Sequence, residues 1–160
     1  MTAIWHPHLS DECYNALRPV FQKHVDKLKD QRPIQSEMLP KERGLYALSE
    51  NGNYLYVGIS RKLRARLSGH RRGVSGSVEP RARASSFAKK VALETMADHG
   101  NKIPRAKKER LADPAYQEAR NAAVGRIRRM DVRFVTWDGA RDDLLMLEMY
   151  AAHALKTPYN

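Results

Sequence analysis

Apolar side chains recur at helical spacing in the first part of the chain. Hydrophobic residues stand every three or four positions between residues 10 and 30, which predicts one helix that Ser10 caps. Residues 31–43 contain Pro33 and Pro40, so we expect them to form a linker. We therefore interpret residues 1–43 as an N-terminal helix followed by a linker.

Two short apolar runs then predict a β-hairpin. The runs 44–48 and 54–58 enclose Asn51 and Gly52, and an Asn-Gly pair between strand-like runs favours a tight turn because both residues tolerate positive φ. A basic helix is expected over residues 61–70, with its leucines turned inward.

The rest of the chain predicts three more helices and one more strand. Helical patterns lie at about 84–98 and 115–130, residues 131–137 alternate as a strand does, and an apolar helix is expected over about 141–155. This order predicts an α+β fold: a small three-stranded, mainly antiparallel sheet, made of the hairpin and the late strand and flanked by helices. In this interpretation residues 44–160 form one domain, with a basic helical insertion at about 74–130.

The charge of the chain points to a class of partner. The 160 residues include 29 Lys and Arg against 18 Asp and Glu, which leaves a net charge of +11. The excess lies in two central blocks, residues 61–90 and 102–129, and it favours a polyanionic partner through steering and counterion release.

The remaining composition excludes several kinds of protein. Cys13 is the only cysteine, so the sequence excludes an internal disulfide and a metal site built from several thiolates. No apolar run approaches the length that crosses a bilayer, and the first residues do not resemble a secretory signal. We therefore expect a cytoplasmic protein with no membrane partner.

One acidic residue lies inside the late apolar helix. The helical neighbours of Glu148, three and four positions away on either side, are all leucine or alanine. A carboxylate on such a face is costly unless it is paired or bound to a cation. A structural ion pair with an arginine and a metal ligand are both consistent with this pattern.

The hairpin and the basic helix carry further candidates. Tyr46 and Tyr56 come from the two predicted strands, each near a glycine suited to a close backbone approach, although ordinary sheet tyrosines would give the same pattern. Arg66 and His70 are four residues apart and share one helix face, for which a solvated basic face is the alternative.

Taken together, these residues resemble the GIY-YIG nuclease family. Residues 44–46 (Gly-Leu-Tyr) and 56–58 (Tyr-Val-Gly) match its paired signature, with leucine and valine in place of the isoleucines. Arg66 and His70 follow where the family places an arginine and, often, a histidine.

The end of the chain carries the same resemblance. Glu148 followed by Asn160 is similar to the family's closing motif. The resemblance covers residues 44–160, although the stretch 74–130 carries no motif.

The resemblance implies a metal-dependent endonuclease that hydrolyses phosphodiester bonds of DNA with one divalent cation, Mg²⁺ or Mn²⁺. Glu148 would be the metal ligand, and Arg66 would hold the scissile phosphate. Tyr46 or His70 would activate the water. The resemblance favours Tyr46, but a phenol with a pKa of about 10 is a weak base unless cations lower that value. Tyr56 would orient water or phosphate.

Asn160 would hold the site together through its amide, and the basic blocks would contact DNA phosphates without reading sequence. The residues expected in these contacts are Arg64, Arg71, Arg72, Arg81, Arg83, Lys89, Lys90, Lys107 and Lys108, and the blocks also hold Lys102, Arg105, Arg110, Arg126, Arg128 and Arg129. One site cuts one strand, so a cut in both strands would need a homodimer or two successive events.

Three other functions fit parts of the sequence. A non-catalytic nucleic-acid-binding protein on the same fold would keep the basic blocks beside an inactive site. An interaction protein would assemble through the helix over 10–30 and bind an acidic partner. A ribosomal-type RNA binder would explain the charge but not Glu148.

Overall fold

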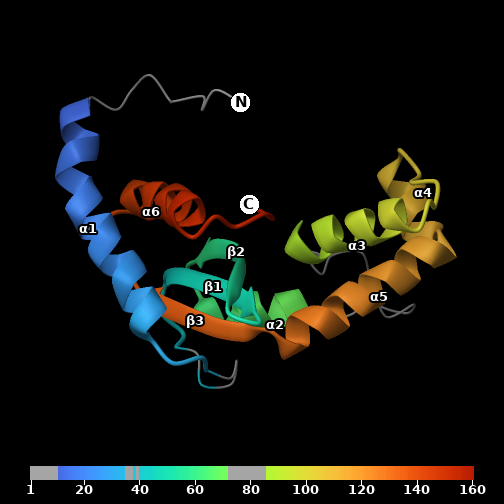
Figure 1. The fold of residues 1–160 in the computed structure, drawn as a ribbon, viewed down its shortest axis with the longest axis horizontal. Helices are drawn as coiled ribbons and strands as arrows, with labels where there is room; N and C mark the ends of the chain where they lie inside the picture. The colour runs from blue at the N-terminus through green and yellow to red at the C-terminus, as the bar shows by residue number, and fades with distance from the viewer. Residues whose placement is uncertain (1–10, 35–37, 39, 72–85) are drawn as a thin grey trace.

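The computed structural model describes residues 11–34, 38, 40–71 and 86–160, with the backbone alone described at residues 11 and 68–71. Three strands form one antiparallel sheet in the order β2-β1-β3 (Figure 1): β1 (Gly44–Glu50), β2 (Asn53–Ser60) and β3 (Asp131–Thr136). The predicted α+β fold, with a hairpin and a late strand flanked by helices, is confirmed.

The hairpin turn has the geometry that its sequence favours. Asn51 and Gly52 have φ values of 52° and 80°, the positive values that a tight turn between two twisted strands requires. The resulting register pairs Gly44 with Ser60 and Tyr46 with Gly58. This register decides which side chains face each other across the hairpin.

Two apolar clusters cover the two faces of the sheet. Because successive side chains of a strand point to opposite faces, Leu45 and Ala47 belong to one cluster, and Tyr46 and Leu48 belong to the other. The first cluster is completed by two helices, α1 (Asp11–Asp30) and α6 (Arg141–Ala154). The second is completed by α2 (Leu63–Arg71), α3 (Ser86–Asp98) and α5 (Pro114–Arg129).

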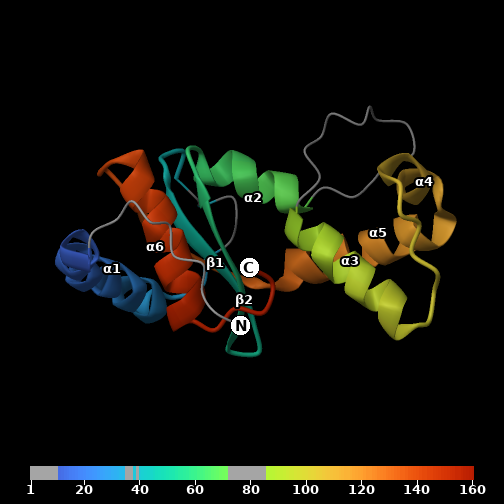
Figure 2. The ribbon, with the colours of Figure 1, turned by 90° about the horizontal axis from the view of Figure 1, so that it is seen from above.

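Three helices extend away from the sheet, as Figures 1 and 2 show. We call α3, α4 (Lys107–Ala112) and α5 the helical arm, residues 86–129. Asp113 caps α5 by accepting the backbone N–H of Tyr116 at 2.9 Å, and Pro114 occupies its first turn. The sequence did not predict α4, because this short helix buries no residue and so lacks an apolar repeat.

Other elements differ from their predicted form. Ile34, in the predicted linker, donates its backbone N–H to Val132 at 2.9 Å and so pairs with β3. The apolar pattern over residues 141–155 is typical of a buried helix, yet Leu145 and Met149 of this helix are 42% and 64% exposed. The predicted cap Ser10 lies outside the described residues, and the division at residue 43 stays a prediction. In the described part of the chain, no helix combines the length and apolar character that a membrane span requires.

Candidate active site

The two hairpin tyrosines lie side by side on the face covered by α2 and the arm. Tyr46 is fully buried and Tyr56 nearly so, and their ring centroids are 6.2 Å apart. Gly58 lies opposite Tyr46, where a Cβ atom would stand only 2.5 Å from the Tyr46 hydroxyl oxygen. Gly44 is as tightly confined, because its Cβ would lie 2.1 Å from the carbonyl oxygen of Val135. Both glycines therefore allow close approaches that any larger residue would prevent.

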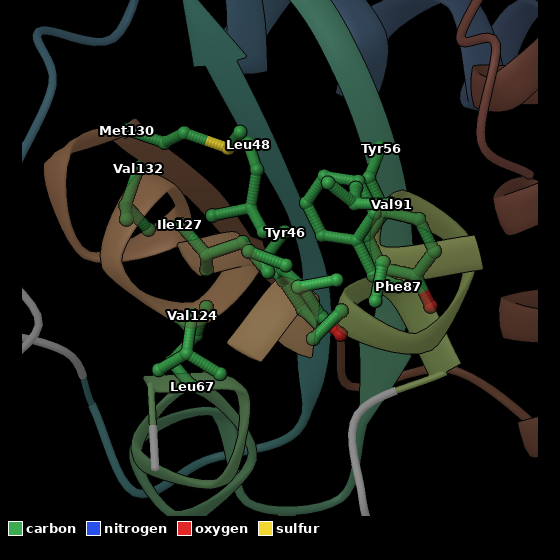
Figure 3. Close-up of a cluster of buried hydrophobic side chains, with 14 of the residues drawn as sticks. Tyr46, Leu48, Tyr56, Leu67, Phe87, Val91, Val124, Ile127, Met130 and Val132 are labelled. Atoms are coloured by element: carbon green, nitrogen blue, oxygen red, sulfur yellow. The ribbon is translucent and has the colours of Figure 1, made fainter. Parts of the chain in front are cut away.

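The arm contributes a ring to the same cluster. Phe87, fully buried at the start of α3, stacks on Tyr56 with ring centroids 4.8 Å apart and planes 7° from parallel (Figure 3). Tyr159 also packs against Phe87, with its ring centroid 5.2 Å from that of Phe87. The orientation of Tyr56 is thus fixed by residues far from the hairpin in sequence.

Arg66 reaches the phenols from α2. Leu63 and Leu67 are fully buried, and their packing brings the intervening Arg66 to the sheet, where its Nε donates to the Tyr46 hydroxyl at 3.4 Å. Burial raises the pKa of Tyr46 far above its ordinary range, and the neighbouring Tyr56 raises it further, although Arg66 acts in the opposite direction. Tyr46 is therefore a neutral phenol at neutral pH in this arrangement.

Glu148 approaches from the opposite side of the sheet, on α6. Its half-buried carboxylate accepts the backbone N–H of Ile59 in β2. Burial raises the pKa of Glu148, while Arg66 and the Ile59 N–H partly offset this rise. Arg66 thus interacts electrostatically with Glu148 as well as bonding to Tyr46.

Asn160 binds the outer strand of the hairpin through both ends of its amide. Its Oδ1 accepts the N–H of Val57 at 2.8 Å, and its Nδ2 donates to the carbonyl of the same residue at 2.7 Å. The neighbouring Tyr159 donates its N–H to Leu55 at 3.2 Å and accepts Lys90 Nζ at 2.8 Å. The last two residues therefore connect β2 to the arm.

The sequence predicted five of these residues, and the structure brings them together around one end of the hairpin. They are Tyr46, Tyr56, Arg66, Glu148 and Asn160. His70 and Arg71 lie in α2, but their side chains are outside the described part of the structure. Arg72, Arg81 and Arg83 are outside the described residues altogether.

Comparison with known proteins adds one distant neighbour. No known protein family matches the chain, and a search of the curated proteins found no match. The fold is similar to the crystal structure of the GIY-YIG N-terminal endonuclease domain of UvrC from Thermotoga maritima, a tyrosine-to-phenylalanine mutant bound to its catalytic divalent cation. The identity is 14%, the alignment covers 85% of this chain and 93% of that chain, and the TM-score is 0.39. At this similarity the function has to be judged from the residues of this chain.

The predicted phosphate contacts fall into two groups. Arg64, Lys89, Lys107 and Lys108 are exposed on helices. Three other basic residues are held by protein groups: Lys90 by Tyr159, Arg126 by Glu50 at 2.7 Å, and Arg110 by the carbonyls of Pro104 and Arg105.

The sequence did not identify two groups that shape the site. Phe87 appeared only as one more apolar position of a helix, and nothing in the sequence pairs it with Tyr56. The Ile59 N–H is a backbone group whose partner depends on where α6 packs. Only the glycines give a signal in the sequence, since a glycine such as Gly58 near a tyrosine suits a close backbone approach.

Proposed function

We propose that the protein is a metal-dependent endonuclease that hydrolyses phosphodiester bonds of DNA in the cytoplasm. One observation carries the proposal. Arg66 bonds to Tyr46 and interacts electrostatically with Glu148, so a guanidinium, a phenol and a carboxylate from three separate elements converge. Such a convergence of a buried phenol with a half-buried guanidinium and a half-buried carboxylate, beside a hairpin, suits phosphoryl chemistry.

Glu148 fits a divalent cation, Mg²⁺ or Mn²⁺. Burial raises the pKa of Glu148, because it disfavours the charged carboxylate. Arg66 and the Ile59 N–H offset this effect only in part, so a bound cation would further stabilise the carboxylate. Among the described residues, no three His, Cys, Asp or Glu side chains come together. The remaining ligands would then be waters and substrate phosphate, as is common for Mg²⁺. When bound, the cation would stabilise negative charge on the transferring phosphate.

Arg66 would hold the scissile phosphate. Its guanidinium is half-buried and already oriented by Tyr46, so binding a phosphate would cost little further ordering. Asn160 would keep β2 in place beside it. Tyr56, fixed by Phe87, would orient water or phosphate through its hydroxyl.

Tyr46 and His70 are the two candidates for the group that takes the proton from water. Because the pKa of Tyr46 is raised, its neutral hydroxyl is favoured over the phenolate. Such a hydroxyl can relay a proton but does not keep a negative charge. An imidazole titrates near neutral pH and is the stronger base there. We therefore propose His70 as the base: the Tyr46 hydroxyl would take the proton from water as it gives its own proton to His70, and it would also orient Arg66.

Exposed basic residues would hold the rest of the DNA. Arg64, Lys89, Lys107 and Lys108 have the exposure that phosphate contacts need. A cut in both strands would require a second copy of the chain or a second binding event.

The alternative is a non-catalytic nucleic-acid-binding protein on the same fold. The complete burial of Tyr46 favours it, because a substrate cannot touch this hydroxyl without some rearrangement. DNA binding without cleavage under all metal conditions would establish the alternative.

Glu148→Gln tests the proposal. We expect this variant to lose nicking of supercoiled plasmid in Mg²⁺ while it still binds DNA, because the metal ligand is lost and the basic surface is kept. Glu118→Gln is the matched control, since Glu118 is exposed on α5. Cleavage by Glu148→Gln at the wild-type rate, or wild-type cleavage that persists in EDTA, would contradict the proposal.

Arg66→Ala tests the role of the guanidinium. We expect a loss of turnover of about 10²–10³-fold, comparable to removing one preorganised charge-stabilising group. Single-turnover cleavage of a labelled oligonucleotide measures it, and Arg64→Ala, which removes an exposed arginine expected to contact phosphate from the same helix, gives the comparison. A loss below about tenfold would reduce Arg66 to one more phosphate contact.

A further inference from the structure

A hollow of about 450 Å³ lies beside Glu148, at the end of β2 and the start of α6. Ile59 forms part of its wall and is also the residue whose N–H binds the Glu148 carboxylate. Leu144 and Leu145, one helical turn before Glu148, form its apolar side. The hollow therefore adjoins the candidate active site through Ile59.

The charge of the hollow is of one sign. Arg43, Arg61 and Arg141 line it together with Ser60, and no lining residue is acidic. Two larger hollows in the described part of the chain differ, because each has lysine together with aspartate among its lining residues. An anion is thus favoured in this hollow more than in the other two.

The three arginines have different roles. Arg43 donates from Nε to Trp137 at 3.0 Å and from Nη2 to two further carbonyls, so it fixes the turn before α6 and shapes the wall. The side chains of Arg61 and Arg141 are exposed, and within the described residues neither side chain forms a hydrogen bond or an ion pair. Asp142 lies next to Arg141 along α6 but does not line the hollow. Two guanidinium groups therefore remain to bind a ligand, and their planar shape matches the oxygens of a phosphate.

The distance between the hollow and Glu148 can be compared with the spacing of phosphates along a nucleic-acid strand. One turn of α6, about 5.4 Å, separates Leu144 and Leu145 from Glu148. One nucleotide advances a strand by about 3.4 Å along the helix axis. A strand whose scissile phosphate faces Glu148 would therefore bring a phosphate to the hollow one or two nucleotides away, with its sugar against the partly exposed Leu145.

We propose that Arg61 and Arg141 form a second phosphate subsite, which holds the nucleic-acid backbone one or two nucleotides from the bond that is cut. The inference rests on the proposed function, and it gives the enzyme a fixed direction for the strand in its site. The subsite sets how the substrate lies and is separate from the chemistry at Glu148.

Arg61→Ala combined with Arg141→Ala tests the subsite on oligonucleotides whose cut position has been mapped. We expect KM and the dissociation constant to rise about tenfold or more, because charge-assisted bonds to phosphate are lost, while kcat at saturation is nearly kept. The salt dependence of binding should weaken by about one counterion for the lost phosphate. Arg18→Ala with Lys29→Ala is the control, since it removes two exposed charges from α1.

A neutral methylphosphonate placed at each linkage in turn locates the contact. We expect one linkage, one or two nucleotides to one side of the cut, to weaken wild-type binding about tenfold and to have no effect on the double variant. Equal losses in the double variant and the α1 control would overturn the subsite, and so would a methylphosphonate effect that persists in the double variant.

The same measurements separate the two proposals. Wild-type cleavage with no change in the double variant overturns the subsite and leaves the endonuclease proposal standing. If the wild-type protein cuts no DNA, the endonuclease proposal fails. The binding data then decide the subsite alone, and tighter binding of an acidic peptide than of the oligonucleotide would overturn it.

Discussion

The two faces of the sheet differ in the side chains that they bury. The face toward α1 and α6 is closed by hydrocarbon side chains, among them Phe21, Val25, Leu28 and Leu147. The face toward α2 and the arm buries two phenols, one of which takes a hydrogen bond from an arginine. This difference assigns stability to the first face and, in the proposed function, chemistry to the second. Glu148 joins the two, because it comes from α6 and meets the site at the outer strand.

Phe21→Ala tests whether the first face is only structural. Phe21 is fully buried, so we expect the free energy of unfolding to fall by about 3–5 kcal/mol. The cleavage rate per folded molecule should stay unchanged, because no group of the site is removed. Denaturant unfolding and cleavage at low temperature measure the two effects. If Phe21→Ala leaves too little folded protein, Phe21→Leu gives the same comparison at a smaller cost. A loss of rate among folded molecules would mean that the two faces are not independent.

Gly58→Ala tests the opposite face. The new Cβ would stand 2.5 Å from the Tyr46 hydroxyl, so the phenol and the attached Arg66 must shift by roughly 1 Å. We expect cleavage to fall about 10²-fold from this misplacement and stability to fall by about 1–3 kcal/mol from overpacking.

Gly125→Ala is its matched control. Gly125 lies inside α5, where a Cβ would meet only Arg129 Nη1 at 3.9 Å. The substitution should leave cleavage unchanged and stabilise the arm by about 0.5–1 kcal/mol, because alanine favours a helix more than glycine does. Equal effects of the two substitutions on cleavage would remove the special role assigned to Gly58.

The smallest expected effect concerns the contact between the sheet and the arm. Hydrogen bonds from Arg126 hold the pKa of Glu50 below its ordinary value of about 4.3. The pair therefore stabilises the fold above that value, and its contribution is lost as the pH falls through the lower folded pKa. Since both side chains are about one-third exposed, we expect only about 0.2–1 kcal/mol.

Glu50→Gln provides the measurement. The difference in unfolding free energy between wild type and variant should be present at neutral pH and should be lost as the pH falls through the lowered pKa of folded Glu50. If the difference in unfolding free energy instead grew as the pH fell, the pair would not stabilise the fold in the way proposed.

The sequence predicted the fold well wherever local signals decide structure. Asn51 and Gly52 fixed the hairpin, and apolar periodicity gave the long helices to within a few residues. It did not predict α4, whose residues bury no side chain, or the pairing of Ile34 with Val132. The pairing depends on which parts of the chain meet in space, whereas α4 has no apolar repeat by which a helix could be recognised.

The site was predictable only as residue types. Their spacing and the family resemblance single out Tyr46, Arg66 and Glu148, but neither predicts the protonation states of these side chains. From the sequence, Tyr46 could act as a base only if neighbouring cations lowered its pKa. In the structure Arg66 does lower that pKa, but burial among the side chains of α2, α5 and the sheet raises it by more. Burial depends on packing between distant elements, and no local pattern reports it.

The amide of Asn160 has a consequence for the molecule in solution. β2 is an outer strand, and such a strand exposes N–H and carbonyl groups on which a second chain can add. Asn160 occupies both groups of Val57, and Tyr159 occupies the carbonyl of Leu55. The two residues thereby prevent a second chain from adding to the middle of the edge strand β2. The segment that borders the candidate site thus also protects the protein against aggregation.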